Sequence, residues 1–175
     1  MLVVFKILFL LSVFVLSTMI GMIIAKRYSN RVSELQELIT ALEILESRMN
    51  YTYDTITEIF DFIARHLKTN VKNLFEYSAE KLSMDKNFSA GELFNATIEE
   101  EKILLDLTEE DIEILKGLTV SLGQVDLENQ VKNIRMILRS LTYQLEDAKQ
   151  EKEKNFKLCR NMGALVGAVL IIILI

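Results

Sequence analysis

The chain has 175 residues, half of them hydrophobic, and its 25 acidic and 20 basic side chains give a formal net charge of −5. An acidic balance argues against nucleic-acid binding, which usually requires a basic face. The single cysteine cannot form an internal disulfide, so nothing in the sequence indicates an oxidising compartment. Between its two apolar ends the chain is long enough for one domain with a core of its own.

The first predicted element is an N-terminal membrane segment. Residues 7–25 carry no charge and would span about 28 Å as a helix, close to the ~30 Å of a bilayer hydrocarbon core. We therefore predict a transmembrane helix within residues 1–25. A cleaved signal peptide is the alternative, but Ile23 is too large for the position three residues before a cleavage after Ala25.

Five helical stretches follow between residues 31 and 122, because apolar side chains recur there every three or four positions. The first continues from the membrane segment. The other four are expected to begin at short polar residues that can accept hydrogen bonds from free backbone N–H groups. These are Asp54, Thr69 or Asn70, Ser89 and Thr108. Ser89 and Thr108 each have an acid three positions later, which is the pattern of a capping box. No stretch alternates as a strand would.

The last predicted helix is the longest and starts at Asp126, after Gly123 has ended the previous one. Its apolar positions define a seam with Leu138 in the middle. They are Leu127, Val131, Ile134, Leu138, Leu141, Leu145 and Ala148. No glycine or proline interrupts the helix before residue 162, so it is expected to continue into the apolar C-terminus.

Residues 162–175 form the second membrane segment, which is uncharged and about 21 Å long as a helix. That is short for a span, so either snorkelling of nearby cations and local thinning complete it, or the tail enters only one leaflet. Basic residues follow the first segment and precede the second, which places residues 26–161 in the cytoplasm and both termini outside. On the first side these residues are Lys26, Arg27 and Arg31.

Small residues repeat every four positions in both membrane segments. Ser17, Gly21 and Ala25 do so in the first, and Gly163 and Gly167 in the second. Such a stripe lets helices approach closely in lipid. We interpret both stripes as candidate faces for membrane helix packing, although glycine and alanine are also simply common in spans.

No residue pattern in the sequence indicates a catalytic, cofactor-binding or metal-binding site. His66 is expected at a helix end, and Cys159 has no second cysteine or histidine with which to form a site. The acidic runs 99–101 and 109–111 are interpreted as solvated faces, with a weak metal or partner site as the alternative. There is no P-loop, dinucleotide fingerprint or zinc spacing. The sequence therefore predicts no enzyme, no catalytic residue, no cofactor and no metal site.

The prediction is thus an all-α protein: a cytoplasmic bundle of about six helices whose long first and last members continue into the membrane segments. Its domains are residues 1–25, 26–161 and 162–175.

The sequence also resembles the stage III sporulation protein AB family of endospore-forming bacteria. The most specific part is Leu122-Gly123, Asp126 and Gln130, followed by the long helix and the glycines at 163 and 167. Further matching residues are Leu35, Leu42-Glu43, Leu45-Glu46, Asn73-Leu74-Phe75 and residues 89–94. The chain departs from the family after Tyr51, where Asp54-Thr55-Ile56 replaces Thr-Pro-Leu. This change concerns a helix start and not the fold.

The resemblance implies a membrane platform in the channel complex that joins mother cell and forespore. The family is similar to the inner-membrane platforms of type II secretion and type IV pili, which sit above a secretion-type ATPase. The implied partners are the stage III sporulation protein AA ATPase and other membrane proteins of the channel complex, with a homo-oligomer left open. The implied location is the mother-cell membrane around the forespore. A general membrane-anchored helical scaffold or adaptor without an ATPase partner is the alternative, and a small membrane enzyme is the remoter one.

Within this framework Gly123, Asp126 and Gln130 form a candidate turn with two interpretations. The turn is purely local if Gly123 ends one helix, Asp126 starts the next and Gln130 is exposed. The alternative is that it meets the ATPase, because capping does not require the family-like glutamine at position 130.

Overall fold

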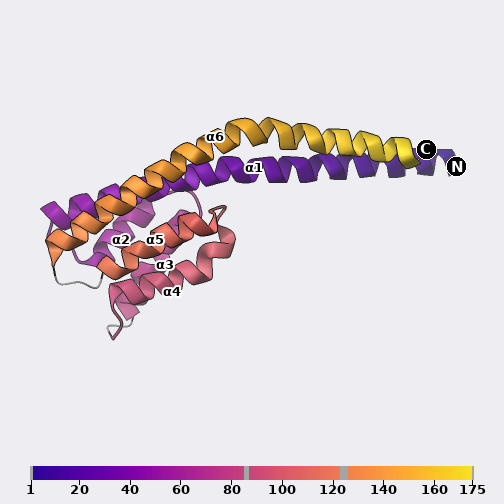
Figure 1. Cartoon of the computed structure of the whole chain (residues 1–175). Coiled ribbons are helices and arrows are strands. Elements are labelled where there is room, and N and C mark those ends of the chain that lie inside the picture. The colour runs from indigo at the N-terminus through magenta and orange to yellow at the C-terminus, as the bar shows by residue number, and fades with distance from the viewer. Residues whose placement is uncertain (1, 85–86, 123–125, 175) are drawn as a thin grey trace. The chain divides into compact units, whose positions relative to one another are not determined.

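The computed structural model describes residues 2–84, 87–122 and 126–174, and these fold as six α-helices and one short 3₁₀ helix (Figure 1). The described ranges contain no strand, so the predicted all-α class is confirmed. The elements are α1 (Leu2–Tyr51), α2 (Ile56–His66), α3 (Val71–Met84), α4 (Ala90–Glu101), η1 (Lys102–Leu104), α5 (Glu109–Ser121) and α6 (Leu127–Leu174).

The chain divides into two compact units, and the two long helices each contribute to both. One unit comprises Met1–Asn30 and Ala148–Ile175, and the other is Arg31–Asp147. The second unit, which we call the bundle, is shorter at both ends than the predicted cytoplasmic range 26–161. The C-terminal half of α1, helices α2 to α5 and the N-terminal part of α6 form it.

The core of the bundle is built on the buried stripe of α1, where Leu35, Leu38, Leu42 and Leu45 have no exposed surface. Their spacing of three and four residues keeps them on one face of the helix. Three further helices contribute one aromatic ring each: Phe60, Phe75 and Phe94 are fully buried, with ring centroids 5.3–5.6 Å apart. Such distances favour aromatic packing beyond simple burial of apolar area.

Side-chain caps define the starts of three middle helices. Ser89 with Glu92 and Thr108 with Asp111 form the two predicted capping boxes. The prediction for α2 was wrong by one residue, since Thr55 is its cap and its hydroxyl accepts from the N–H of Glu58. Asp54 instead accepts hydrogen bonds from Arg48 and from the hydroxyl of Thr52. The Asp54 carboxylate is therefore bound to Arg48 and does not cap α2.

Helices α4 and α5 approach so closely that only glycine fits at one position. A Cβ atom on Gly91 would lie 2.0 Å from the carbonyl oxygen of Thr119. This contact between backbones explains a glycine in the first turn of α4, where its low helix propensity is a cost.

The buried seam of α6 differs in part from the predicted one. Val131, Ile134, Leu141 and Ala148 are buried as expected. At the centre, however, Ile137 is buried and Leu138 is only half-buried, and Leu127 is 47% exposed. Ile137 and Leu138 are both apolar, and the sequence spacing alone does not show which of the two adjacent positions faces the core. Truncation of Leu138 is therefore expected to cost less than truncation of a fully buried leucine.

Candidate functional site

A buried ion pair lies at the end of the bundle where α1 enters and α6 leaves. Nε of Arg31 donates to Oδ2 of Asp111 at 2.8 Å, and Nη2 donates to Oδ1 at 3.1 Å. Nη2 also donates to Oε1 of Gln144 at 3.0 Å. The exposed fractions of the three residues are 5%, 0% and 5%. The fork geometry of arginine suits this two-point contact and joins α1, α5 and α6.

This pair corrects the interpretation of residues 109–111 as a solvated face, because Asp111 belongs to the core. Arg31 keeps its place among the cations that follow the membrane segment, but its charge is paired. Both are buried, and Asp111 additionally accepts from the N–H of Thr108 at 2.9 Å. A carboxylate in the first turn of a helix is expected from the helix dipole alone, so the sequence did not reveal its second role.

Two glutamates on the same side of α1 bind backbone groups of the connecting loops. Glu34 accepts from the N–H of Asp106 at 2.7 Å. Glu37 accepts from the N–H groups of Lys68 and Thr69, each at 2.9 Å. A carboxylate is a strong acceptor for such unpaired loop N–H groups. The sequence analysis did not identify either residue, although Glu34 lies three positions from both Arg31 and Glu37 and is therefore a neighbour of each on the helix surface.

Burial raises the pKa of Glu34 from its ordinary value of 4.5 to about 7. The side chain is only 3% exposed, and water therefore cannot solvate its charge. The hydrogen bond from Asp106 lowers the pKa and the negative charges of Asp106 and Glu37 raise it, but burial is the largest cause.

The candidate turn is described from Asp126 onward, and Gly123 lies outside the described residues. Asp126 caps α6 as predicted, since its Oδ1 accepts from the N–H of Glu128 at 3.0 Å. The local interpretation of the turn is wrong in its exposed Gln130, because this residue is only 9% exposed. Nearby, Asn133 donates to the carbonyl of Gly117 at 3.1 Å and to the hydroxyl of Ser121 at 2.8 Å. The start of α6 is thus fixed to the end of α5 by polar contacts that apolar periodicity does not reveal.

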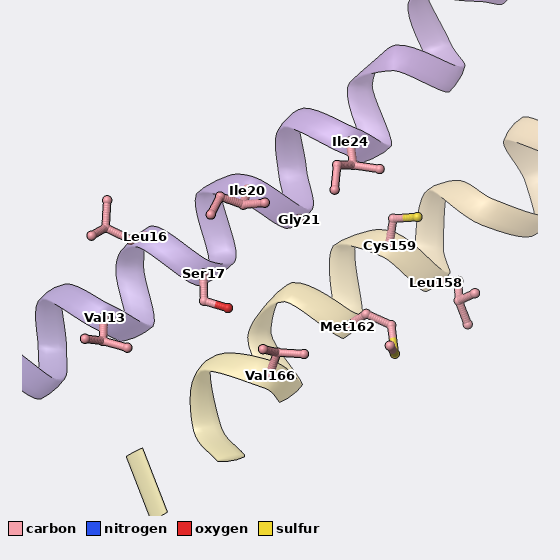
Figure 2. A pocket seen from close by; sticks show the side chains of 10 residues that line it. All are labelled: Val13, Leu16, Ser17, Ile20, Gly21, Ile24, Leu158, Cys159, Met162 and Val166. Atoms are coloured by element: carbon pink, nitrogen blue, oxygen red, sulfur yellow. The ribbon is translucent and has the colours of Figure 1, made fainter. Parts of the chain in front are cut away.

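In the unit formed by the two chain ends, segments of α1 and α6 lie side by side and enclose an apolar groove of about 620 Å³ (Figure 2). Residues of the predicted N-terminal stripe lie on or beside it: Ser17 is half-buried, Gly21 is buried and Ala25 is 1% exposed. The backbone of Gly163 and Gly167 belongs to α6, but the surroundings of these glycines lie outside the described residues. The groove is lined by Val13, Leu16, Ser17, Ile20, Gly21, Ile24, Leu158, Cys159, Met162 and Val166.

The outward face of the same α1 segment is apolar. Leu8, Leu11, Val15, Met19 and Ile23 do not line the groove and are each between 47% and 61% exposed. A continuous apolar surface of this kind is unusual on a protein surrounded by water. Among the described residues, one helix is long and apolar enough to cross a membrane, and it contains this segment.

Side chains suited to a metal site do not gather within the described ranges. These contain no group of three or more His, Cys, Asp or Glu residues that could hold a metal ion. His66 is exposed, and its Nδ1 lies 2.7 Å from the carbonyl oxygen of Phe62 in the preceding turn. Cys159 is half-buried in the apolar groove.

These features define a class of small all-helical proteins in which a folded bundle continues, through its first helix, into a segment suited to a membrane. The family model described as "Stage III sporulation protein AB" matches residues 6–175. The chain therefore belongs to the stage III sporulation protein AB family, which confirms the resemblance. It is a sporulation protein, and the family is not a known enzyme family.

Two relatives agree with this assignment. The Stage III sporulation protein AB of Bacillus subtilis (strain 168) is 29% identical over 169 residues, which cover 97% of this chain and 98% of that protein. A solved structure named "Stage III sporulation protein AB (SpoIIIAB)" is 26% identical and superposes with a TM-score of 0.68. It covers 71% of this chain and 98% of its own.

We predict that Asp111→Asn lowers the free energy of unfolding of the bundle by about 3–5 kcal/mol. The substitution leaves the buried guanidinium of Arg31 without a counter-charge. Urea denaturation of the full chain in detergent micelles, followed by circular dichroism, measures the effect. The matched control is Glu110→Gln, an exposed acid in the same helical turn, which should change stability by less than about 0.5 kcal/mol. Equal effects of the two variants would contradict a dominant role of the pair.

The raised pKa of Glu34 predicts a pH dependence of stability. Folding favours protonated Glu34, so its contribution is complete below about pH 4.5 and is lost as the pH rises through about 7. Glu34→Gln keeps an acceptor for the N–H of Asp106 but cannot ionise. The variant should therefore lose less stability than the wild type between about pH 5 and about pH 8. Parallel pH profiles would show that Glu34 titrates normally, and the exposed Glu43→Gln serves as the control for a general charge effect.

Proposed function

We propose that the protein is a membrane platform of the sporulation channel between mother cell and forespore, and that its bundle couples this platform to a secretion-type ATPase. The observation that carries the proposal is α1. This single 50-residue helix combines an exposed apolar segment with the central stripe of the bundle core. Family membership supports the sporulation context, and the ATPase partner follows from the family's similarity to secretion platforms.

The proposed orientation places the bundle in the cytoplasm of the mother cell. Arg31 also follows the first apolar run, and in the folded bundle its charge is buried against Asp111. Lys26 and Arg27 after the first apolar run are exposed, and Lys154 and Lys157 before the second are exposed as well. The remaining cations therefore still favour the cytoplasmic side.

The first test concerns topology. In a Cys159→Ser background, single cysteines replace Leu2, Lys81 or Ile175, and an impermeant thiol reagent is applied to intact cells that produce the protein. We expect the reagent to label the two terminal cysteines and to leave the one at position 81 unlabelled until the cells are opened. Labelling only at position 81 would reverse the orientation, and labelling at one terminus would remove one of the two spans.

The second test concerns the ATPase. The full chain in lipid nanodiscs should bind the purified stage III sporulation protein AA ATPase from the same genome, and empty nanodiscs should not. Surface plasmon resonance measures the binding. Absence of binding by a correctly folded, correctly inserted chain would favour the alternative function, a general membrane-anchored scaffold without an ATPase partner.

A further inference from the structure

A second groove lies on the bundle, where the end of α1 meets the beginning of α6. Its volume is about 880 Å³. One lining residue belongs to α1, and the others belong to the first three to four turns of α6. The lining residues are Asn50, Leu127, Glu128, Asn129, Val131, Lys132, Arg135, Met136 and Arg139.

The groove combines apolar anchors with positive charge. Leu127 and Met136 are 47% and 52% exposed, which leaves two large apolar side chains accessible to a partner. Lys132 and Arg139 are exposed, and within the described ranges neither forms an ion pair with a carboxylate. Arg135 already forms an ion pair within the bundle, since its Nε donates to Oε1 of Glu46 at 2.6 Å.

This concentration of positive charge contrasts with the rest of the molecule. The whole chain carries a net charge of −5, whereas the groove lining contains one acid, Glu128, and two cations besides the paired Arg135. Charges of one sign around an apolar centre attract a partner of the opposite sign and orient it. The exposed cations Lys132 and Arg139 therefore favour a partner with acidic side chains beside an apolar one.

The length of the groove indicates the form of the partner. The lining residues on α6 extend over positions 127–139, which corresponds to about 18 Å along the helix. A partner helix of about three turns matches this length. Met136 lies four residues after Lys132 and three residues before Arg139, so these three side chains share one face of α6. A partner helix that covers Met136 with an apolar side chain can therefore bring acidic side chains to both cations.

We infer that this groove docks an acidic amphipathic helix of the protein's cytoplasmic partner. The inference rests on the proposed function, in which that partner is the ATPase, and it specifies the contact surface. It also relocates the predicted contact from Gln130, which is buried, to the neighbouring exposed face of the same helix.

The test uses the full chain in nanodiscs and the purified ATPase, with the double variant Lys132→Glu/Arg139→Glu. We expect the affinity for the ATPase to fall at least about tenfold, because both charges then repel an acidic helix. The control Lys68→Glu/Lys72→Glu makes the same change of net charge on another surface and should stay within about twofold. Wild-type binding should also weaken as salt rises from about 50 to about 300 mM.

A third variant, Met136→Ser, tests the apolar part without a change of charge and should weaken binding about fivefold. All exchanged side chains are exposed or partly exposed, and circular dichroism melts should match the wild type. If the wild type binds and the groove variants bind equally well, the groove is not the docking site while the proposed function stands. If the wild type does not bind at all, both the proposed function and this inference are overturned.

Discussion

The bundle depends on the buried pair of Arg31 and Asp111. A guanidinium at this depth requires a carboxylate, because an unpaired buried charge costs several kcal/mol. The pair joins α1 to α5, and a third hydrogen bond from Arg31 to Gln144 adds α6 to the same contact. Apolar side chains tolerate many alternative packings of helices. A bidentate contact between residues 80 positions apart restricts the bundle to an arrangement in which the three helices are in register.

Two glutamates of α1 also bind the backbone of the loops between the shorter helices. Glu34 binds the backbone before α5, and Glu37 binds the backbone between α2 and α3. Each contact satisfies loop N–H groups that would otherwise lack a partner near the core. One helix therefore carries an apolar stripe that builds the core and a charged stripe that fixes how the shorter helices connect. Burial of this charged stripe is unfavourable for Glu34, because it raises the pKa of the carboxyl and favours the protonated form.

The fold was largely predictable from the sequence, because helix periodicity and caps are local signals. Ser89, Thr108 and Asp126 cap the helices that they were expected to cap. The buried polar contacts were not predictable in this way. A charge on a helix surface and a charge in a three-helix junction have the same sequence pattern, so the sequence predicts a solvated Asp111 and reveals nothing of the partner of Arg31. Gln130 was misjudged for the same reason, and the choice between Leu138 and Ile137 required the helix phase.

Helix α1 reverses its surface character along its length, and this reversal connects the fold with the proposed role. Before Lys26 most of its described exposed residues are apolar, such as Leu16 and Ile23, and its most buried ones are the small Gly21 and Ala25. After Asn30 its exposed residues are polar, such as Gln36 and Glu43, and leucines are buried. In lipid, close packing relies on small residues because apolar side chains have no reason to avoid the surroundings. In water, the apolar side chains are the ones that must be buried. A helix with both patterns in sequence is suited to pass from a bilayer into the cytoplasm without a break, and a platform that joins a membrane complex to a cytoplasmic motor requires such an element.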